Sequence, residues 1–273
     1  MDATFAAPAA SYPTARPPRA AFALLPLLRP LVTFAVLVFA WWAAVLLFEP
    51  EPWLVPSPVA VGAVLFDQAG YFLRHATITA GEIVLGLALG AVLGGGTAVL
   101  IHLFAPLRRW ALPLVVSSQA LPVFAVAPLL MTWFGLGLGS KVAMATLIIY
   151  FPVASALLDG LERVPADWVD LGRTMGLGRW GALRRVRLPA AMPAFASGLR
   201  VAATIAPIGA VVGEWVGAAG GLGFVMNQAN ARLQTDVTFA ALICLVVLVV
   251  VLRALVVALL DRFVFWSPRT DSS

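Results

Sequence analysis

Apolar residues gather in six long runs along the chain, and shorter polar segments separate the runs. A bilayer core about 30 Å thick needs about 20 apolar residues in a helix. The runs therefore predict six transmembrane helices, over residues 31–48, 76–104, 112–134, 142–158, 194–216 and 238–260. Glycines recur at every fourth position in the second and fifth of these spans, at Gly86, Gly90 and Gly94 and at Gly209, Gly213 and Gly217. This spacing lets helices approach closely in lipid and predicts a packed bundle.

Prolines interrupt the third predicted span, at Pro122 and Pro128. Proline frees backbone carbonyls, which are tolerated at membrane depth only where they face protein or a watery cavity. Ser117, Ser118 and Gln119 stand just before Pro122. This stretch is therefore a candidate wall of a translocation path. The alternative is that its polar groups only join neighbouring helices by hydrogen bonds.

The composition agrees with a membrane protein. Hydrophobic residues make up 62% of the 273 residues and charged residues 11%, with a mean hydropathy of +0.97. An average soluble domain is about 45–50% apolar and about 25% charged. A soluble fold could not cover so much apolar surface with so few charges. The predicted fold class is therefore an all-α integral membrane protein with six transmembrane helices.

The basic residues predict the orientation in the membrane. With both termini in the cytoplasm, thirteen basic residues lie inside and three lie outside, namely Arg74, Lys141 and Arg232. Such a bias is typical of cytoplasmic loops, and it explains the net charge of +5 without nucleic-acid binding. We expect a disordered cytoplasmic tail over residues 1–29, a transmembrane domain over 30–265 and a C-terminal tail over 266–273. The single cysteine, Cys244, is interpreted as a small buried apolar residue.

The longest polar segment, residues 159–193, is too rich in features for a simple connector. It holds six arginines and four acids. Asp167 is a plausible N-cap for a first short helix that runs to Thr174, and Gly176 with Gly178 predicts a turn. A second short helix follows from residue 179 to 188, and Pro189 is expected to stop it. The alternative interpretation is a basic loop that lies against anionic lipid head groups.

The spacing within this segment is specific. It reads Asp170-Leu171-Gly172, three residues, Gly176, nine residues, and then Val186-Arg187-Leu188-Pro189. This resembles the coupling motif of permease subunits of binding-protein-dependent ABC importers, which is Glu-Ala-Ala, three residues, Gly, nine residues and Ile-x-Leu-Pro. Every spacing matches, and only Leu171 and Gly172 depart in residue type. Similar family segments occur at 127–135 (APLLMTWFG), 213–215 (GEW) and 220–223 (GGLG).

The resemblance implies a type I importer permease in a bacterial inner membrane, with no enzymatic activity of its own. Its hairpin would insert into a groove on a separate ABC ATPase subunit. A periplasmic or lipid-anchored solute-binding protein would deliver the solute, and a second copy of the chain would complete a homodimer in contact with membrane lipids. No cofactor is expected, because the partner subunit binds ATP. The only lysine, Lys141, lies between Ser140 and Val142 and is not part of a phosphate-binding loop.

The solute is the least determined part. The segment 227–242 (NQANARLQTDVTFAAL) looks most like permeases for pyrimidine precursors of thiamine. The alternatives are aliphatic sulfonates, taurine, nitrate or riboflavin-type solutes. A secondary transporter would show inverted repeats, and a membrane-embedded enzyme would show convergent catalytic groups. The sequence shows neither feature.

Several ionisable residues fall within or beside the predicted spans. An acid within a span is a functional candidate by default. We expect Glu82 to reach the head-group region, whereas Glu214 is equally consistent with a head-group position and with a place in the translocation path. Lys141 is expected to be an anchor at the outer interface. His75 and His102 stand near opposite ends of the second predicted span and therefore cannot share a metal ion.

Overall fold

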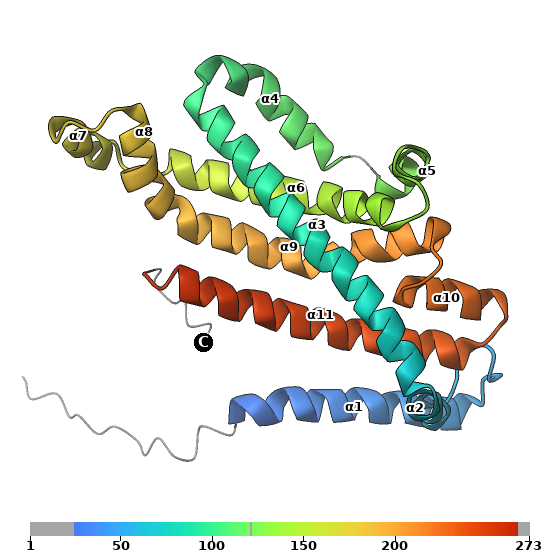
Figure 1. The fold of residues 1–273 in the computed structure, drawn as a ribbon. Coiled ribbons are helices and arrows are strands. Elements are labelled where there is room, and N and C mark those ends of the chain that lie inside the picture. Colours follow the sequence, from blue (N-terminus) through green and yellow to red (C-terminus); the bar gives the residue numbers. More distant parts are fainter. Residues whose placement is uncertain (1–24, 121, 267–273) are drawn as a thin grey trace, which may run out of the picture. The chain divides into compact units, whose positions relative to one another are not determined.

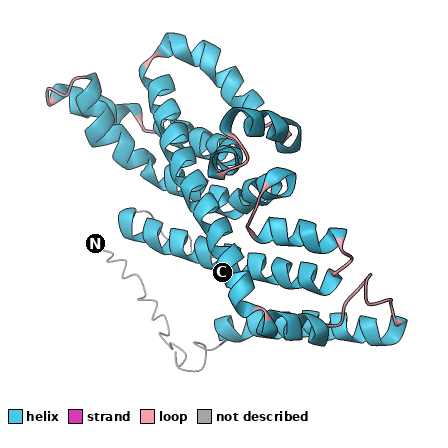
Figure 2. Cartoon of the chain, turned by 45° about the vertical axis from the view of Figure 1, so that its right-hand side comes forward, coloured by secondary structure: helices cyan, strands magenta, loops and turns pink. Residues whose placement is uncertain are grey.

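A computed structural model describes residues 25–120 and 122–266, in which every regular element is a helix (Figures 1 and 2). The chain forms two compact units, residues 1–50 and 51–273. The first unit contains α1, Leu25–Phe48, whose described apolar part is Val32–Phe48. The predicted tails fall mainly on residues 1–24 and 267–273, which lie outside the described residues.

The second unit contains the remaining helices. They are α2 (Pro58–Asp67), α3 (Ala69–Leu103), α4 (Ala105–Ser118), α5 (Val123–Phe134), α6 (Leu138–Glu162), α7 (Ala166–Thr174), α8 (Arg179–Ala182), the π-helical turn η1 (Leu183–Arg187), α9 (Leu188–Gly217), α10 (Leu222–Ala231) and α11 (Thr235–Phe263). The end of this unit that carries α7, α8 and η1 is called the arginine-rich end below. The end that carries α2 and α10 is called the opposite end.

Helix α6 lies at the centre of the second unit and packs against both α3 and α9, and α3 crosses these two helices (Figure 1). The predicted glycine stripes make these contacts. A Cβ built on Gly86 of α3 would lie 2.5 Å from the Cβ of Ala145, and one on Gly209 of α9 would lie 2.6 Å from the Cα of Ala145. Both helices therefore approach α6 as closely as backbones allow. The predicted role of the glycines in helix packing is confirmed.

Four helices in the described part of the chain are long and apolar enough to cross a membrane: α3, α6, the continuous helix Arg179–Gly217, and α11. Each extends beyond the span predicted for it by several residues at one end or both. The predicted loops before α3 and after α9 contain the short helices α2 and α10. Ser57 caps α2 through its Oγ, which accepts a hydrogen bond from the amide of Ala60.

The third predicted span is not one straight helix. It is divided into α4 and α5, which meet at 105°. Pro122 precedes α5 with ψ 113°, an extended conformation, and its nitrogen has no proton to donate. Just before Pro122, the amide of Ala120 donates a hydrogen bond to the carbonyl of Ser117 at 3.0 Å and forms a tight turn. Helices α4 and α5 together therefore form either one broken membrane span or a re-entrant segment.

The hairpin also differs from its prediction in two details. Pro165, and not Asp167, occupies the N-cap position of α7, and Asp167 lies in the first turn. Pro189 does not end the second helix, because it sits in the first turn of α9. The preceding turn is π-helical, and the amide of Leu188 donates to the carbonyl of Leu183, five residues earlier. This wider turn makes room for the proline ring, which clashes with the preceding turn of a regular α-helix.

Candidate functional site

The turn between α7 and α8 is fixed by backbone hydrogen bonds around Gly176. Gly176 has φ +83°, a left-handed conformation that costs other residues roughly 1–2 kcal/mol. Its amide donates to the carbonyl of Arg173 at 2.9 Å, and the amide of Leu177 donates to the carbonyl of Gly172 at 3.0 Å. Together these bonds form the glycine-terminated helix end that reverses the chain. The geometry explains why this position of the motif is glycine.

Leu177 fills the space between the two arms of the hairpin. A Cβ built on Gly172 would lie 3.1 Å from Cδ1 of Leu177, and one built on Gly181 would lie 3.2 Å from Cδ2. The absence of side chains at 172 and 181 therefore accommodates Leu177. The departure of Gly172 from the alanine of the motif has a local packing explanation.

An apolar stripe runs along the outside of α7. It consists of Trp168, Leu171 and Met175, whose exposed fractions are 56%, 63% and 77%. Positions three and four apart lie on one face of a helix. The other face turns Val169 inward, where it packs with Ala182. An exposed apolar patch on a short polar hairpin indicates an interaction surface.

A groove of about 590 Å³ lies beside this stripe. Its lining includes Trp168 and Leu171 of α7, Val186 and Pro189 of the second arm, and Trp266 beyond α11. The indole Nε1 of Trp266 donates to the carbonyl of Pro189 at 3.2 Å. Sequence reasoning missed Trp266, which was assigned to the tail. A tryptophan just after a membrane span is a common interfacial anchor and was the available signal.

The motif residues other than Gly176, which forms the turn, divide into three groups. Leu171, Val186 and Pro189 line the groove. Gly172 and Leu188 are buried or half-buried, and Leu188 packs against the core around Leu183. Asp170 faces solvent and pairs with Arg173 of the same helix at 2.9 Å. The structure brings the predicted coupling residues together on one hairpin.

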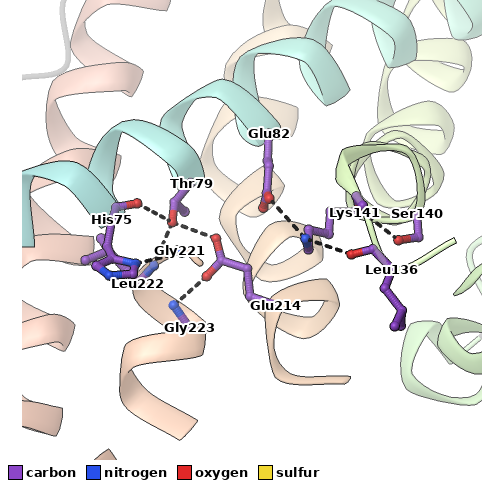
Figure 3. Close-up of polar contacts among 11 residues, drawn as sticks. His75, Thr79, Glu82, Leu136, Ser140, Lys141, Glu214, Gly221, Leu222 and Gly223 are labelled. Atoms are coloured by element: carbon purple, nitrogen blue, oxygen red, sulfur yellow. Dashed lines mark hydrogen bonds and ion pairs between the residues drawn. The ribbon is translucent and has the colours of Figure 1, made fainter. Parts of the chain in front are cut away.

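Near the opposite end, a buried polar cluster joins α3, α9 and the glycine-rich loop that leads into the first turn of α10 (Figure 3). Glu214 of α9 is 1% exposed. Its Oε1 accepts a hydrogen bond from the hydroxyl of Thr79 at 2.6 Å, and its Oε2 accepts one from the amide of Gly223 at 2.5 Å. Glu214 therefore connects three segments from the protein interior.

The same loop is held by two further bonds (Figure 3). The amide of Leu222 donates to Thr79 Oγ1 at 2.9 Å, and the amide of Gly221 donates to Nδ1 of His75 at 3.0 Å. Gly221 has φ +108°, and a Cβ there would overlap the carboxylate of Glu214. Glycine is required at this point by conformation and by space. His75 thereby has a structural role as a hydrogen-bond acceptor.

Lys141 and Glu82 form a second buried pair beside this cluster (Figure 3). Nζ of Lys141 lies 3.8 Å from Oε1 of Glu82 and donates to the carbonyl of Leu136 at 3.3 Å. The side chains are 7% and 1% exposed. The predictions of an interfacial Lys141 and a head-group Glu82 are wrong. Because α3 begins at Ala69, Glu82 lies in its fourth turn and packs inward.

The candidate path residues do not form one site. Ser117, Gln119 and Pro122 are exposed at the α4–α5 break, and the hydroxyl of half-buried Ser118 donates to the carbonyl of Val115 at 2.7 Å. Glu214 belongs to the buried cluster and also lines the hollow between the end of α9 and α10. It is 1% exposed and both of its oxygens accept hydrogen bonds from protein donors, which favours an interior position over the head-group region. The exposed break leaves Ser117, Gln119 and Pro122 available to line a path.

A hollow of about 300 Å³ lies at the opposite end, between the end of α9 and α10. Trp215, Phe224, Asn227 and Gln228 are among its lining residues. The side-chain amide of Asn227 donates to the carbonyl of Trp215 at 3.2 Å. Phe124 of α5 lies near, with its ring centroid 6.3 Å from that of Trp215. Aromatic faces and amides therefore meet at one place, as in many small-molecule sites.

No group of three or more His, Cys, Asp or Glu side chains that could hold a metal ion occurs among residues 25–120 and 122–266. His102, near the other end of α3, has its Nε2 3.0 Å from Nη1 of Arg187. The two histidines thus contact different partners at different ends of one helix.

Comparison with known proteins agrees with the motif. Residues 82–265 match the family described as the binding-protein-dependent transport system inner membrane component. The chain is 48% identical over 241 residues to a probable ABC transporter permease protein of Haemophilus influenzae, covering 88% of this chain and 98% of that protein. It is 34% identical to the formylaminopyrimidine transport permease protein ThiX of Halalkalibacterium halodurans, over 80% of this chain and 87% of the relative.

The fold agrees as well. The inward-facing MetNI methionine ABC transporter contains a similar chain, with a TM-score of 0.63 and 21% sequence identity, covering 72% of this chain and 97% of that one. Permeases of this kind work with ATPase and substrate-binding subunits and are not enzymes themselves. The matched residues include the whole hairpin and the buried cluster from Glu82 onward. The chain therefore belongs to the family of inner-membrane permease components of binding-protein-dependent ABC importers.

Proposed function

We propose that this permease couples ATP hydrolysis on a separate subunit to solute import through the hairpin α7–α8. The observation that carries this proposal is the exposed apolar stripe of Trp168, Leu171 and Met175, placed on a hairpin whose turn is fixed by Gly176. An amphipathic helix of this kind is suited to insertion into a groove of a partner. The ATPase subunit binds ATP and supplies that groove.

The orientation follows from charge. The hairpin and the adjoining helix ends carry most of the arginines, and a cytoplasmic location satisfies the preference of basic loops for that side. The arginine-rich end then faces the ATPase in the cytoplasm. The opposite end, with α2 and α10, faces the binding protein in the periplasm or on a lipid anchor. The membrane is the bacterial inner membrane, and both termini are cytoplasmic.

A second copy of the same chain completes the transport unit. Phe124, Leu129 and Trp133 of α5 and Ile208 of α9 are all more than half exposed in the single chain. A homodimer would cover such surfaces, and the path would then run between the two copies. The central helices α3, α6 and α9 are packed through glycines and move as one body. Movement of the hairpin is thus transmitted through α9 to the opposite end.

The proposed solute is a pyrimidine precursor of thiamine. The hollow beside Trp215 supports this choice, because aromatic rings stack on planar heterocycles and amides bond to ring nitrogens and amino groups. The similarity to a formylaminopyrimidine permease supports the same class. The alternatives are sulfonate, taurine, nitrate or riboflavin-type solutes. The described lining of the hollow contains no cation to pair with a sulfonate.

Uptake by reconstituted vesicles tests the solute. The permease, its ATPase and its binding protein are placed in proteoliposomes, and ATP-dependent uptake of labelled formylaminopyrimidine is measured against unlabelled taurine, nitrate and riboflavin. The proposal expects that none of these three compounds reduces the uptake of the labelled pyrimidine. A Trp215→Ala variant is expected to slow uptake by between about fivefold and a hundredfold while ATPase binding is retained, because stacking contributes roughly 1–3 kcal/mol per base. Competition by taurine would identify a sulfonate permease instead.

A further inference from the structure

A basic hollow lies between the end of α3 and the hairpin. Its volume is about 240 Å³, and its lining includes His102 of α3, Arg173 of α7, Arg179 of α8 and Arg187 of η1. The described residues that line it include no aspartate or glutamate. Clustered cations in a partly enclosed space focus positive potential. The hollow is therefore a place where an anion is strongly attracted.

Arg187 lacks a counter-ion within the described part of the chain. It is half-buried, and Nη1 lies 3.0 Å from Nε2 of His102 and 3.4 Å from the carbonyl of Leu161. Neither the imidazole of His102 nor the carbonyl of Leu161 carries a negative charge that could neutralise the guanidinium. The ion pairs of the described arginines involve Arg108, Arg173 and Arg200, and neither Arg179 nor Arg187 is among them. A partly buried guanidinium without an anion is unfavourable.

The acids on the neighbouring elements are already engaged. Asp170 pairs with Arg173 at 2.9 Å, and Glu162 pairs with Arg108 at 2.9 Å. The described residues thus place two unpaired guanidinium groups at one hollow and supply no carboxylate for them. A bound anion would supply the missing negative charge.

The position of the hollow indicates which anion is available. His102 is the penultimate residue of α3, one of the helices long and apolar enough to cross a membrane, so the hollow lies at the end of a candidate membrane span. Guanidinium groups bind phosphate oxygens in a two-pronged geometry. Basic pockets between membrane helices on the cytoplasmic side bind phospholipid head groups.

We propose that this hollow binds a phosphate group through Arg179 and Arg187, and that the phosphate belongs to an anionic phospholipid of the adjoining leaflet. The bound phosphate bridges the end of α3 and the second arm of the hairpin. It holds the hairpin against the span, and the apolar stripe on the far side of α7 remains free. The site goes beyond the transport function proposed above, and only the choice of leaflet rests on the proposed orientation.

Thermal unfolding of the purified transporter in detergent tests the site. The probes are short-chain phosphatidylglycerol, short-chain phosphatidylcholine and inorganic phosphate, added to wild type and to Arg179→Gln, Arg187→Gln and Arg184→Gln. Arg184 is an exposed arginine of the same turn that does not line the hollow, and it serves as the matched control. Phosphatidylglycerol is expected to raise the Tm of wild type and of Arg184→Gln, with an apparent affinity about tenfold weaker in the other two variants. Phosphatidylcholine is expected to have no effect.

Each alternative result has a definite meaning. An equal response to phosphatidylglycerol in all four proteins, or none in wild type, overturns the site. Protection by inorganic phosphate at the same concentration keeps the phosphate site and overturns its assignment to a lipid. If Arg187→Gln fails to fold, the exposed Arg179→Gln decides the question. Solute uptake is measured separately for each variant, so a failure of the lipid site is distinguished from a failure of the transport proposal.

Discussion

Cδ1 of Leu177 lies where a side chain at residue 172 would point, because a Cβ built on Gly172 would be 3.1 Å from it. Leu177 is half-buried, and its methyl group is the far end of a flexible side chain. A Gly172→Ala variant, which restores the alanine of the coupling motif, is therefore expected to be accommodated by a small shift.

Gly172→Ala is accordingly expected to preserve or raise the stability of the hairpin. Alanine is favoured over glycine in a helix by about 1 kcal/mol, and the shift of Leu177 opposes only part of that gain. ATPase binding is expected to stay within about twofold of wild type, and the Tm should not fall. Gly172→Phe serves as the contrasting variant, because its ring cannot share the space with Leu177. Loss of binding in the alanine variant would show that Leu177 cannot shift and that position 172 requires glycine.

The turn at Gly176 gives a prediction that depends on backbone conformation alone. Nothing lies within 4 Å of a Cβ built there, so a side chain meets no steric obstacle. The positive φ still disfavours alanine by about 1–2 kcal/mol, whereas asparagine tolerates this conformation better. Solute-stimulated ATPase activity is expected to decrease in the order wild type, Gly176→Asn, Gly176→Ala. An alanine variant with full activity would contradict the fixed turn.

The sequence predicts contacts that depend on local spacing. The stripes of Gly86 to Gly94 and Gly209 to Gly217 predict close helix packing, and Gly176 predicts the turn, because each signal is contained within a few residues. The break before α5 was partly predictable, since Pro122 announces an interruption but not its 105° angle. Features that depend on a few neighbouring residues can therefore be predicted from the sequence alone.

Contacts between distant segments were not predictable. The pairing of Lys141 with Glu82 depends on where α3 begins and on how α3 lies against α6, and hydropathy gives helix ends poorly. The connection of Glu214 to the amide of Gly223 depends on the fold of the loop before α10. The π-helical turn before Pro189 has no sequence signal of its own. Glu82 and Lys141 are therefore predicted at the interface, although both side chains are buried.

Glu214 is expected to stabilise the opposite end of the bundle. Glu214→Ala leaves the amide of Gly223 without an acceptor in the interior, at about 1–3 kcal/mol for a buried donor. The hydroxyl of Thr79 loses its acceptor at 2.6 Å and keeps only the carbonyl of His75 at 3.3 Å. Glu214→Gln keeps one acceptor oxygen and should lie between wild type and alanine. The order of Tm values in detergent is the measurement. Equal Tm values for wild type and Glu214→Ala would show that the cluster does not hold the loop.

The buried pair of Lys141 and Glu82 calls for a double-mutant cycle. Removing one charge leaves the other uncompensated in the interior, which typically costs about 3–5 kcal/mol, whereas replacing both is often neutral. Lys141→Met and Glu82→Gln are each expected to lower the Tm and the yield of folded protein. The double variant should recover most of the loss. Additive losses in the double variant would mean that the two side chains do not interact.

The central claim is that the apolar stripe on α7 docks the ATPase. The most direct measurement is the affinity of the purified permease for its ATPase subunit, with Leu171→Asp and Leu171→Met as a matched pair. Leu171 is 63% exposed, so neither change should alter the fold, and equal Tm values will verify this. An unpaired carboxylate buried in the groove of the ATPase subunit is expected to weaken binding about a hundredfold or more. The Leu171→Met variant is expected to bind like wild type. If Leu171→Asp binds the ATPase as tightly as wild type does, the stripe is not the coupling surface.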